Sequence, residues 1–168
     1  RVTDADDTGV TDRIDPDATL SLGGGIFVYT GDRDRSQTFN SALVLSGGMS
    51  RLSTSRDAGT GSNPYLEFDS LTVADPTAMV HTGSSNSEIR FANDPSGTNP
   101  KNVIANIRIG DDFGYIDTAN NNRILPLGSY DNVAPNAWTA TTVSNFSATG
   151  DADGDLTGDT DVFAFRYN

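Results

Sequence analysis

Two aspartate-rich stretches carry the oxygen ligands that calcium prefers in proteins. In the first, the aspartates and Gly9 follow the spacing of a calcium-binding loop, whereas the second has Leu156 where that loop needs glycine. The candidate ligands are Asp4, Asp6, Asp12 and Asp15 in the first stretch and Asp151, Asp153, Asp155 and Asp159 in the second. Two interpretations stay open: Ca²⁺ binds at these loops, or they are solvated acidic surface.

Catalytic chemistry finds little support. Asp111 and Asp112 form a carboxylate pair after an expected strand, and carboxylate pairs are the catalytic groups of polysaccharide hydrolases. The chain has no cysteine, and its one histidine, His81, has no acidic neighbour in sequence. We expect that the protein is not an enzyme, with a polysaccharide-active enzyme as the less favoured alternative.

The last residues alternate so that Phe163, Phe165 and Tyr167 share one face of an expected strand. Three aromatics on an acidic protein need cover from water. The strand either folds back onto its own chain or docks onto the next copy as a self-assembly interface. In the second case the net charge of −12 opposes association, so assembly should strengthen with salt or divalent cations.

The elements that must position these groups are short strands. Four apolar pairs, each flanking one residue, recur every 23 positions. The pairs are Leu20 and Leu22, Leu43 and Leu45, Leu66 and Phe68, and Ile89 and Phe91. Because residues two apart share one face of a strand, each pair should face the core, while middle residues such as Glu67 and Arg90 face out. A fixed period in the twenties predicts a β-solenoid with the four pairs in common columns, about 4.8 Å apart per coil. A β-sandwich or jelly roll is the alternative.

Composition agrees with an all-β chain. Only 35% of the 168 residues are apolar, and no stretch has a sustained helical period. The acidic charge disfavours nucleic-acid binding, and no apolar run is long enough to span a membrane. We expect an acidic cap or linker over residues 1–17, a β-solenoid over 18–143, and an acidic arc with the terminal aromatic strand over 144–168.

A family resemblance covers about residues 12–142. The run Ala18-Thr-Leu-Ser-Leu-Gly-Gly-Gly-Ile-Phe27 and the similar runs 36–39 and 42–50 resemble the autotransporter-associated β-strand repeat. Residues 88–91, 122–128 and the segment around Trp138 resemble its closing part. The chain departs from the family in its charged loops and in Pro126, where glycine is usual.

The resemblance implies a right-handed parallel β-helix in the passenger region of a bacterial surface or secreted protein, without catalytic residues. The expected function is therefore a structural segment of a surface fibre or filament, located outside the cell or at its surface, that assembles with copies of itself. A glycan-binding or adhesive module is the alternative.

Overall fold

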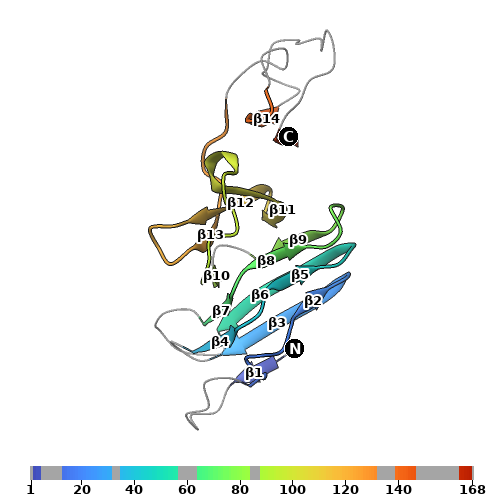
Figure 1. Cartoon of the computed structure of the whole chain (residues 1–168), viewed down its shortest axis with the longest axis vertical. Helices are drawn as coiled ribbons and strands as arrows, with labels where there is room; N and C mark the ends of the chain where they lie inside the picture. Colours follow the sequence, from blue (N-terminus) through green and yellow to red (C-terminus); the bar gives the residue numbers. More distant parts are fainter. Residues whose placement is uncertain are drawn as a thin grey trace.

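The computed structural model describes residues 2–4, 13–31, 35–56, 64–83, 88–131, 139–146 and 163–167, with backbone only for 2–4, 144–146 and 164–167. This part of the chain is nearly all β, with one short 3-10 turn at Pro100–Asn102, which confirms the all-β expectation. The molecule is elongated (Figure 1). The strands are β1 (Val2–Asp4), β2 (Ser21–Leu22), β3 (Gly25–Gly31), β4 (Ser36–Phe39), β5 (Leu43–Leu45), β6 (Met49–Arg56), β7 (Tyr65–Phe68), β8 (Leu71–Val73), β9 (Met79–Thr82), β10 (Glu88–Phe91), β11 (Val103–Ile109), β12 (Asp112–Asp117), β13 (Arg123–Pro126), β14 (Val143–Phe146) and β15 (Ala164–Tyr167).

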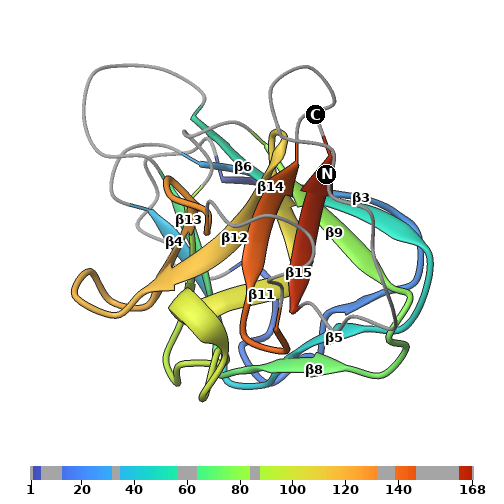
Figure 2. The ribbon, with the colours of Figure 1, turned by 90° about the horizontal axis from the view of Figure 1, so that it is seen from above.

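Parallel pairing arranges eleven of these strands in three stacks. We call β1-β3-β6-β9-β11 the long wall, β4-β7-β10 the polar wall and β2-β5-β8 the short wall. Every pairing within each wall is parallel. Seen along the long axis, the walls surround a common interior (Figure 2), and one buried core cluster draws side chains from all three.

The expected common columns at a spacing of 23 are wrong. Leu43 lies in β5 on the short wall and pairs with Leu71, whereas Leu66 lies in β7 on the polar wall between Gln37 and Ile89. The step is 23 positions from β2 to β5 and from β7 to β10, but 29 from β4 to β7 and 30 from β6 to β9. Because the connections differ in length, the interval from Leu43 to Leu66 joins two different walls.

The inward positions of the polar wall form a column of aromatic rings. Phe39, Phe68 and Phe91 occupy the same register position on successive strands, and none is more than 2% exposed. The rings of Phe39 and Phe68 stack with centroids 4.9 Å apart and planes 7° apart, and Phe91 lies tilted 6.2 Å from Phe68. Here the expected alternation is confirmed, since Glu67 and Arg90 occupy the outward positions between buried residues.

Antiparallel strands join the long wall to the polar wall at one end of the stack. β11 pairs with β12, β12 with β13, and β13 with β10, so that one sheet continues from wall to wall. Gly114 of β12 packs closely against both neighbouring strands, because a Cβ there would come within 3.0 Å of the methyl groups of Ile107 and Ile124. The edge strands of the sheet, β1 and β4, lie together at the opposite end (Figure 1).

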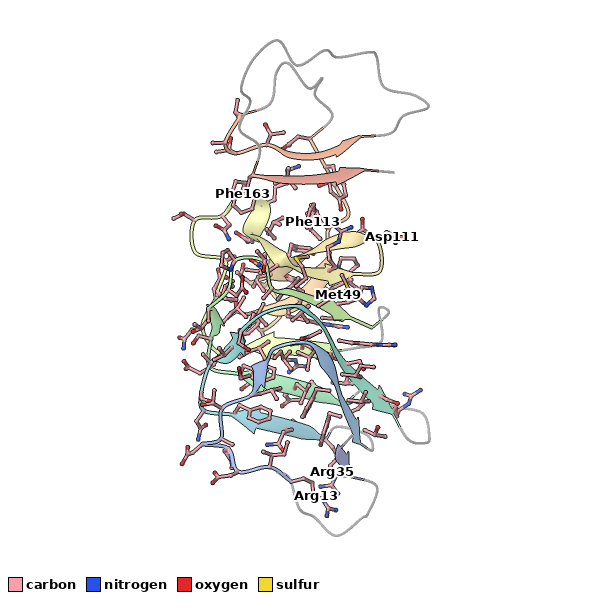
Figure 3. All side chains as sticks on the ribbon, turned by 90° about the vertical axis from the view of Figure 1, so that its right-hand side faces the viewer. Arg13, Arg35, Met49, Asp111, Phe113 and Phe163 are labelled. Carbon is pink, nitrogen blue, oxygen red and sulfur yellow. The ribbon has the colours of Figure 1, made fainter. Side chains whose placement is uncertain are left out.

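A second, smaller core packs beside these antiparallel strands. It buries Val103, Phe113, Leu127 and Val143, with Tyr115, Tyr130 and Phe163 against them. Figure 3 shows Phe113 and Phe163 toward the end opposite Arg13 and Arg35.

Asp131 fastens this core to β14, which pairs in parallel with β15. Its carboxylate accepts the N–H of Val143 at 2.8 Å and lies 2.9 Å from Lys101 Nζ. The Val143 N–H first, and Lys101 second, hold the pKa of Asp131 below its ordinary value.

Residues 13–18 form a foot beneath the polar wall. The buried Gln37 side chain accepts the N–H groups of Arg13 and Ile14 at 2.9 and 2.8 Å and donates to the Ile14 carbonyl at 3.0 Å. This amide therefore satisfies backbone groups that no neighbouring strand pairs.

The corner after the polar wall carries a row of carboxylates and amides. Asn40 Nδ2 donates to Asp17 Oδ1 at 2.9 Å, and Asn93 Nδ2 donates to Asp69 Oδ1 at 2.8 Å. We call Asp17, Asn40, Asp69 and Asn93 the corner ladder. Its two carboxylates stand two strand steps apart, since the foot lies below β4 and Asp69 follows β7.

Candidate functional site

The outer face of the polar wall carries both glutamates of the chain, in which every other acidic residue is an aspartate. Glu88 is the register neighbour of Tyr65, and Glu67 that of Arg90. On its other side Arg90 faces Arg123 of β13 across an antiparallel pairing. Two carboxylates, two guanidinium groups and a phenol ring therefore come together from three strands.

Glu88 is the centre of this cluster. Only 7% of the residue is exposed, and its Oε1 accepts hydrogen bonds from Arg90, with Nε at 2.7 Å and the terminal Nη2 as a second donor. Arg123 Nη1 lies 4.0 Å from the other carboxylate oxygen. The Arg90 guanidinium also covers the Tyr65 ring, with Cζ 3.9 Å from the centroid. A buried carboxylate needs such partners, so this group is held in one place.

Arg123 retains hydrogen-bonding capacity in this cluster. Its Nε is buried and has no hydrogen-bond partner among the residues that the structure describes. A buried donor of this kind gains free energy from any acceptor that reaches it.

An open groove of about 420 Å³ adjoins the cluster. Its lining consists of Glu67, Phe91, Ala92, Thr118, Ala119, Asn121 and Asn122. It therefore combines a carboxylate, a hydroxyl and two amides in a solvent-open depression. Such groups suit reversible binding of a polar ligand through hydrogen bonds.

The turn beside the groove has a defined local cause. Asp117 accepts the Ala119 N–H at 3.1 Å and the Asn120 side-chain amide at 2.6 Å, which closes the turn after β12. Asn121 and Asn122 then adopt φ of 55° and 49°, a left-handed conformation that asparagine tolerates better than most residues. This turn places both amides along the groove.

Of the predicted calcium ligands, the structure describes only Asp4 and Asp15. Asp4 lies in β1 opposite Gly31, and the Asp15 carboxylate accepts the N–H of Asp17 at 3.0 Å. The other predicted ligands, Asp6, Asp12, Asp151, Asp153, Asp155 and Asp159, lie outside the described residues. Within the described ranges no three potential ligand side chains cluster as a metal site would need, and calcium binding stays a prediction.

Of the carboxylate pair after β11, Asp111 lies in the tight turn and Asp112 begins β12. Asp111 is exposed, its carbonyl accepts a hydrogen bond from Arg108 at 2.7 Å, and Asp112 Oδ1 accepts the Tyr130 hydroxyl at 3.0 Å. His81 lies on the outer face of the long wall, in register with Arg108. These contacts give the pair a structural role at the turn.

The aromatic strand is described in part. Phe163 packs against the second core of its own chain. Phe165 and Tyr167 lie in β15, which pairs with β14, and their side chains fall outside the described part of the molecule. Their role as an interface stays a prediction.

The polar-wall cluster has a partial signal in the sequence. Tyr65-x-Glu67 and Glu88-x-Arg90 repeat 23 positions apart, which predicts neighbouring outward side chains on adjacent strands. Their meeting with Arg123 was missed, because it depends on an antiparallel pairing with β13.

In comparisons with protein-family models, curated proteins and solved structures, the chain has no match. In the described ranges, no helix has the length and apolar character needed to cross a membrane.

Proposed function

We propose that this chain is a structural segment of a bacterial fibre outside the cell or at its surface, built as a right-handed parallel β-helix that assembles with copies of itself. The observation that carries the proposal is the parallel, in-register stacking of strands in three walls around one core. Such stacks extend in one direction and display edge strands at their ends. Right-handed winding follows the strong preference of parallel connections.

The family resemblance supports the extracellular part of this proposal. Passenger regions of that family serve as stalks or adhesive surfaces, and the proposal assigns no reaction to this chain. Copies would join end to end. The β14–β15 pair, with Phe165 and Tyr167 in β15 and Phe163 just before it, would meet the end that carries β1, β2 and β4. Backbone pairing between edges would supply affinity, and the aromatics would supply apolar contact.

Sedimentation velocity and negative-stain electron microscopy of the purified chain test this proposal. We expect filaments that lengthen as salt rises, because salt screens the repulsion between copies of charge −12. Removing residues 162–168 should leave a folded monomer that no longer forms filaments. A wild-type chain that stays monomeric at every salt and protein concentration would contradict the proposal.

Calcium is the expected cofactor of the two acidic loops. If it binds there, thermal melts with excess Ca²⁺ should show a higher midpoint than melts with chelator, because a ligand that binds only the folded state stabilises it. Identical midpoints, together with no metal in elemental analysis, would leave both loops as acidic surface.

A second candidate function is glycan binding, and the groove beside Glu67 is the observation that favours it. Hydroxyl-rich sugars pair with carboxylate and amide groups of the kind that line it. Binding of a panel of neutral and acidic polysaccharides should weaken in Glu67→Gln, whereas Asp111→Asn, which removes one exposed acid elsewhere, should bind as the wild type does. Equal binding by both variants would rule the groove out.

A further inference from the structure

The outer face of the long wall differs in composition from the rest of this acidic protein. None of the residues in β3, β6, β9 or β11 is acidic, although the chain contains 23 aspartates and glutamates. The outward side chains there include Ile26, Met49, Arg51, Met79, His81 and Arg108. Enrichment in methionine and arginine with depletion of acids is the composition of a protein–protein interface core.

Two of these side chains expose large apolar surface side by side. Ile26 is 70% exposed and Met49 is 75% exposed. Ile26 of β3 pairs with Arg51 of β6. Met49 lies two residues before Arg51 in β6, so it is on the same face as Ile26 and diagonally next to it. Two apolar side chains left in water at neighbouring positions gain free energy when another surface covers them.

The same face carries a row of basic side chains. Arg51, His81 and Arg108 are register partners on successive strands, β6, β9 and β11. Arg51 and Arg108 stand two strand steps apart, with His81 between them. Among the described residues, none gives the Arg51 side chain a hydrogen bond or ion pair, and its guanidinium is therefore available to a partner.

We infer that this face of the long wall binds the corner ladder of a second copy of the chain, side by side. The two carboxylates of the ladder, Asp17 and Asp69, stand two strand steps apart, as do Arg51 and Arg108. At the usual strand spacing both separations are about 9.6 Å, so with the two copies antiparallel Arg51 meets Asp69 while Arg108 meets Asp17. The net charge of −12 makes the rest of each copy repel other copies, which restricts this contact to the basic wall.

A protein partner fits this face better than an anionic polysaccharide does. Ile26 and Met49 flank the basic row. A carbohydrate chain coated with carboxylates or sulfates would leave both without apolar contact, whereas the corner of a second copy brings the exposed Ala92 beside Asn93 of the ladder. The contact is heterologous, since the wall of one copy meets the corner of the next, and it does not close on itself. It would produce lateral arrays, and it rests on the proposed self-assembly while using a surface distinct from the end-to-end joint.

Charge exchange on the full chain tests the contact. Arg51→Glu reverses the charge of the wall, and Asp69→Lys that of the ladder. The matched control, Ser129→Glu with Thr141→Glu, changes the net charge as much as Arg51→Glu does, at two exposed positions beside the second core and on neither surface. Thermal melts verify that each variant is folded, and sedimentation velocity over a concentration series measures association.

We expect Arg51→Glu to raise the protein concentration needed for lateral association by about tenfold or more, while the control behaves as the wild type. Asp69→Lys alone should also raise the protein concentration needed for lateral association. A 1:1 mixture of the two variants should associate again, because Glu at position 51 of one variant meets Lys at position 69 of the other. Equal association by Arg51→Glu and its control would overturn the inference, as would a folded pair that fails to associate when mixed. If Asp69→Lys does not fold, the comparison of Arg51→Glu with its control decides alone.

Further outcomes distinguish this inference from polyanion binding and from the end-to-end fibre proposal. If Arg51→Glu keeps its self-association but loses retention on a dextran sulfate column, the wall binds polyanions and the inference fails. Single filaments in Arg51→Glu, where the wild type forms bundles, would support it. If the wild type forms no filaments yet still associates through Arg51, the fibre proposal fails and the lateral contact stands.

Discussion

Replacing Phe68 with alanine should be among the most damaging changes to the core. The side chain is fully buried in the middle of the aromatic column and stacks on Phe39 at 4.9 Å. Truncating a buried phenylalanine costs about 3–5 kcal/mol, and a stacked ring pair contributes about 1 kcal/mol beyond its buried area. We therefore expect a loss of about 4–5 kcal/mol from a total stability of about 5–15 kcal/mol for a domain of this kind.

Urea unfolding followed by circular dichroism measures this loss. Phe27→Ala is the matched control, because Phe27 is only half-buried and should cost clearly less. A double-mutant cycle between Phe39 and Phe68 should give a coupling of about 1 kcal/mol. A cost for Phe68→Ala below about 1.5 kcal/mol, or no larger than that of Phe27→Ala, would refute the stacked column.

Three further predictions follow from single contacts. Asp131→Asn should lower the melting temperature at pH 7. Because the folded-state pKa of Asp131 lies below its unfolded value of about 3.9, the stability that its carboxylate contributes is present above that pH and is lost as pH falls through the folded pKa. The melting temperatures of variant and wild type should therefore converge in acid, and a difference that persists there would contradict the prediction. Gly114→Ala should cost about 1–3 kcal/mol in urea unfolding, whereas Gly128→Ala, with open space around it, should cost little; equal costs would count against the tight approach. Gln37→Leu should lower the free energy of unfolding by about 1–3 kcal/mol, because the N–H groups of Arg13 and Ile14 lose their hydrogen-bond acceptor. An unchanged urea midpoint would show that water replaces the amide.

Local alternation was predictable from the sequence, and the assignment of strands to walls was not. A period of two depends on neighbouring residues only, so Leu66 and Phe68 were correctly placed inward and Glu67 outward. The wall that each strand joins depends on the lengths of the connections, and these differ between successive coils. The equal interval from Leu43 to Leu66 therefore carried no structural meaning.

The candidate site depends even more on non-local pairing. Arg90 meets Arg123 because β13 returns antiparallel to β10 after two reversals of the chain. The strand before Asp111 was expected from the sequence, but the strand that follows was not, because Asp112–Asp117 mixes buried and polar residues without a clean alternation. Composition had suggested the aspartate-rich loops as the site, whereas the described cluster is built around the two glutamates.

The antiparallel strands at one end give the molecule a direction for unfolding. β12 and β13 each pair with two neighbours, so neither can leave without breaking two ladders at once. β4, in contrast, has one partner strand and is otherwise held by the foot through Gln37 and Asn40. Amide hydrogens of β12 and β13 should therefore exchange only with global opening, and those of β4 through smaller local openings. We therefore expect the coils to unfold in order from the foot, with the long wall and the polar wall joined at the far end until last.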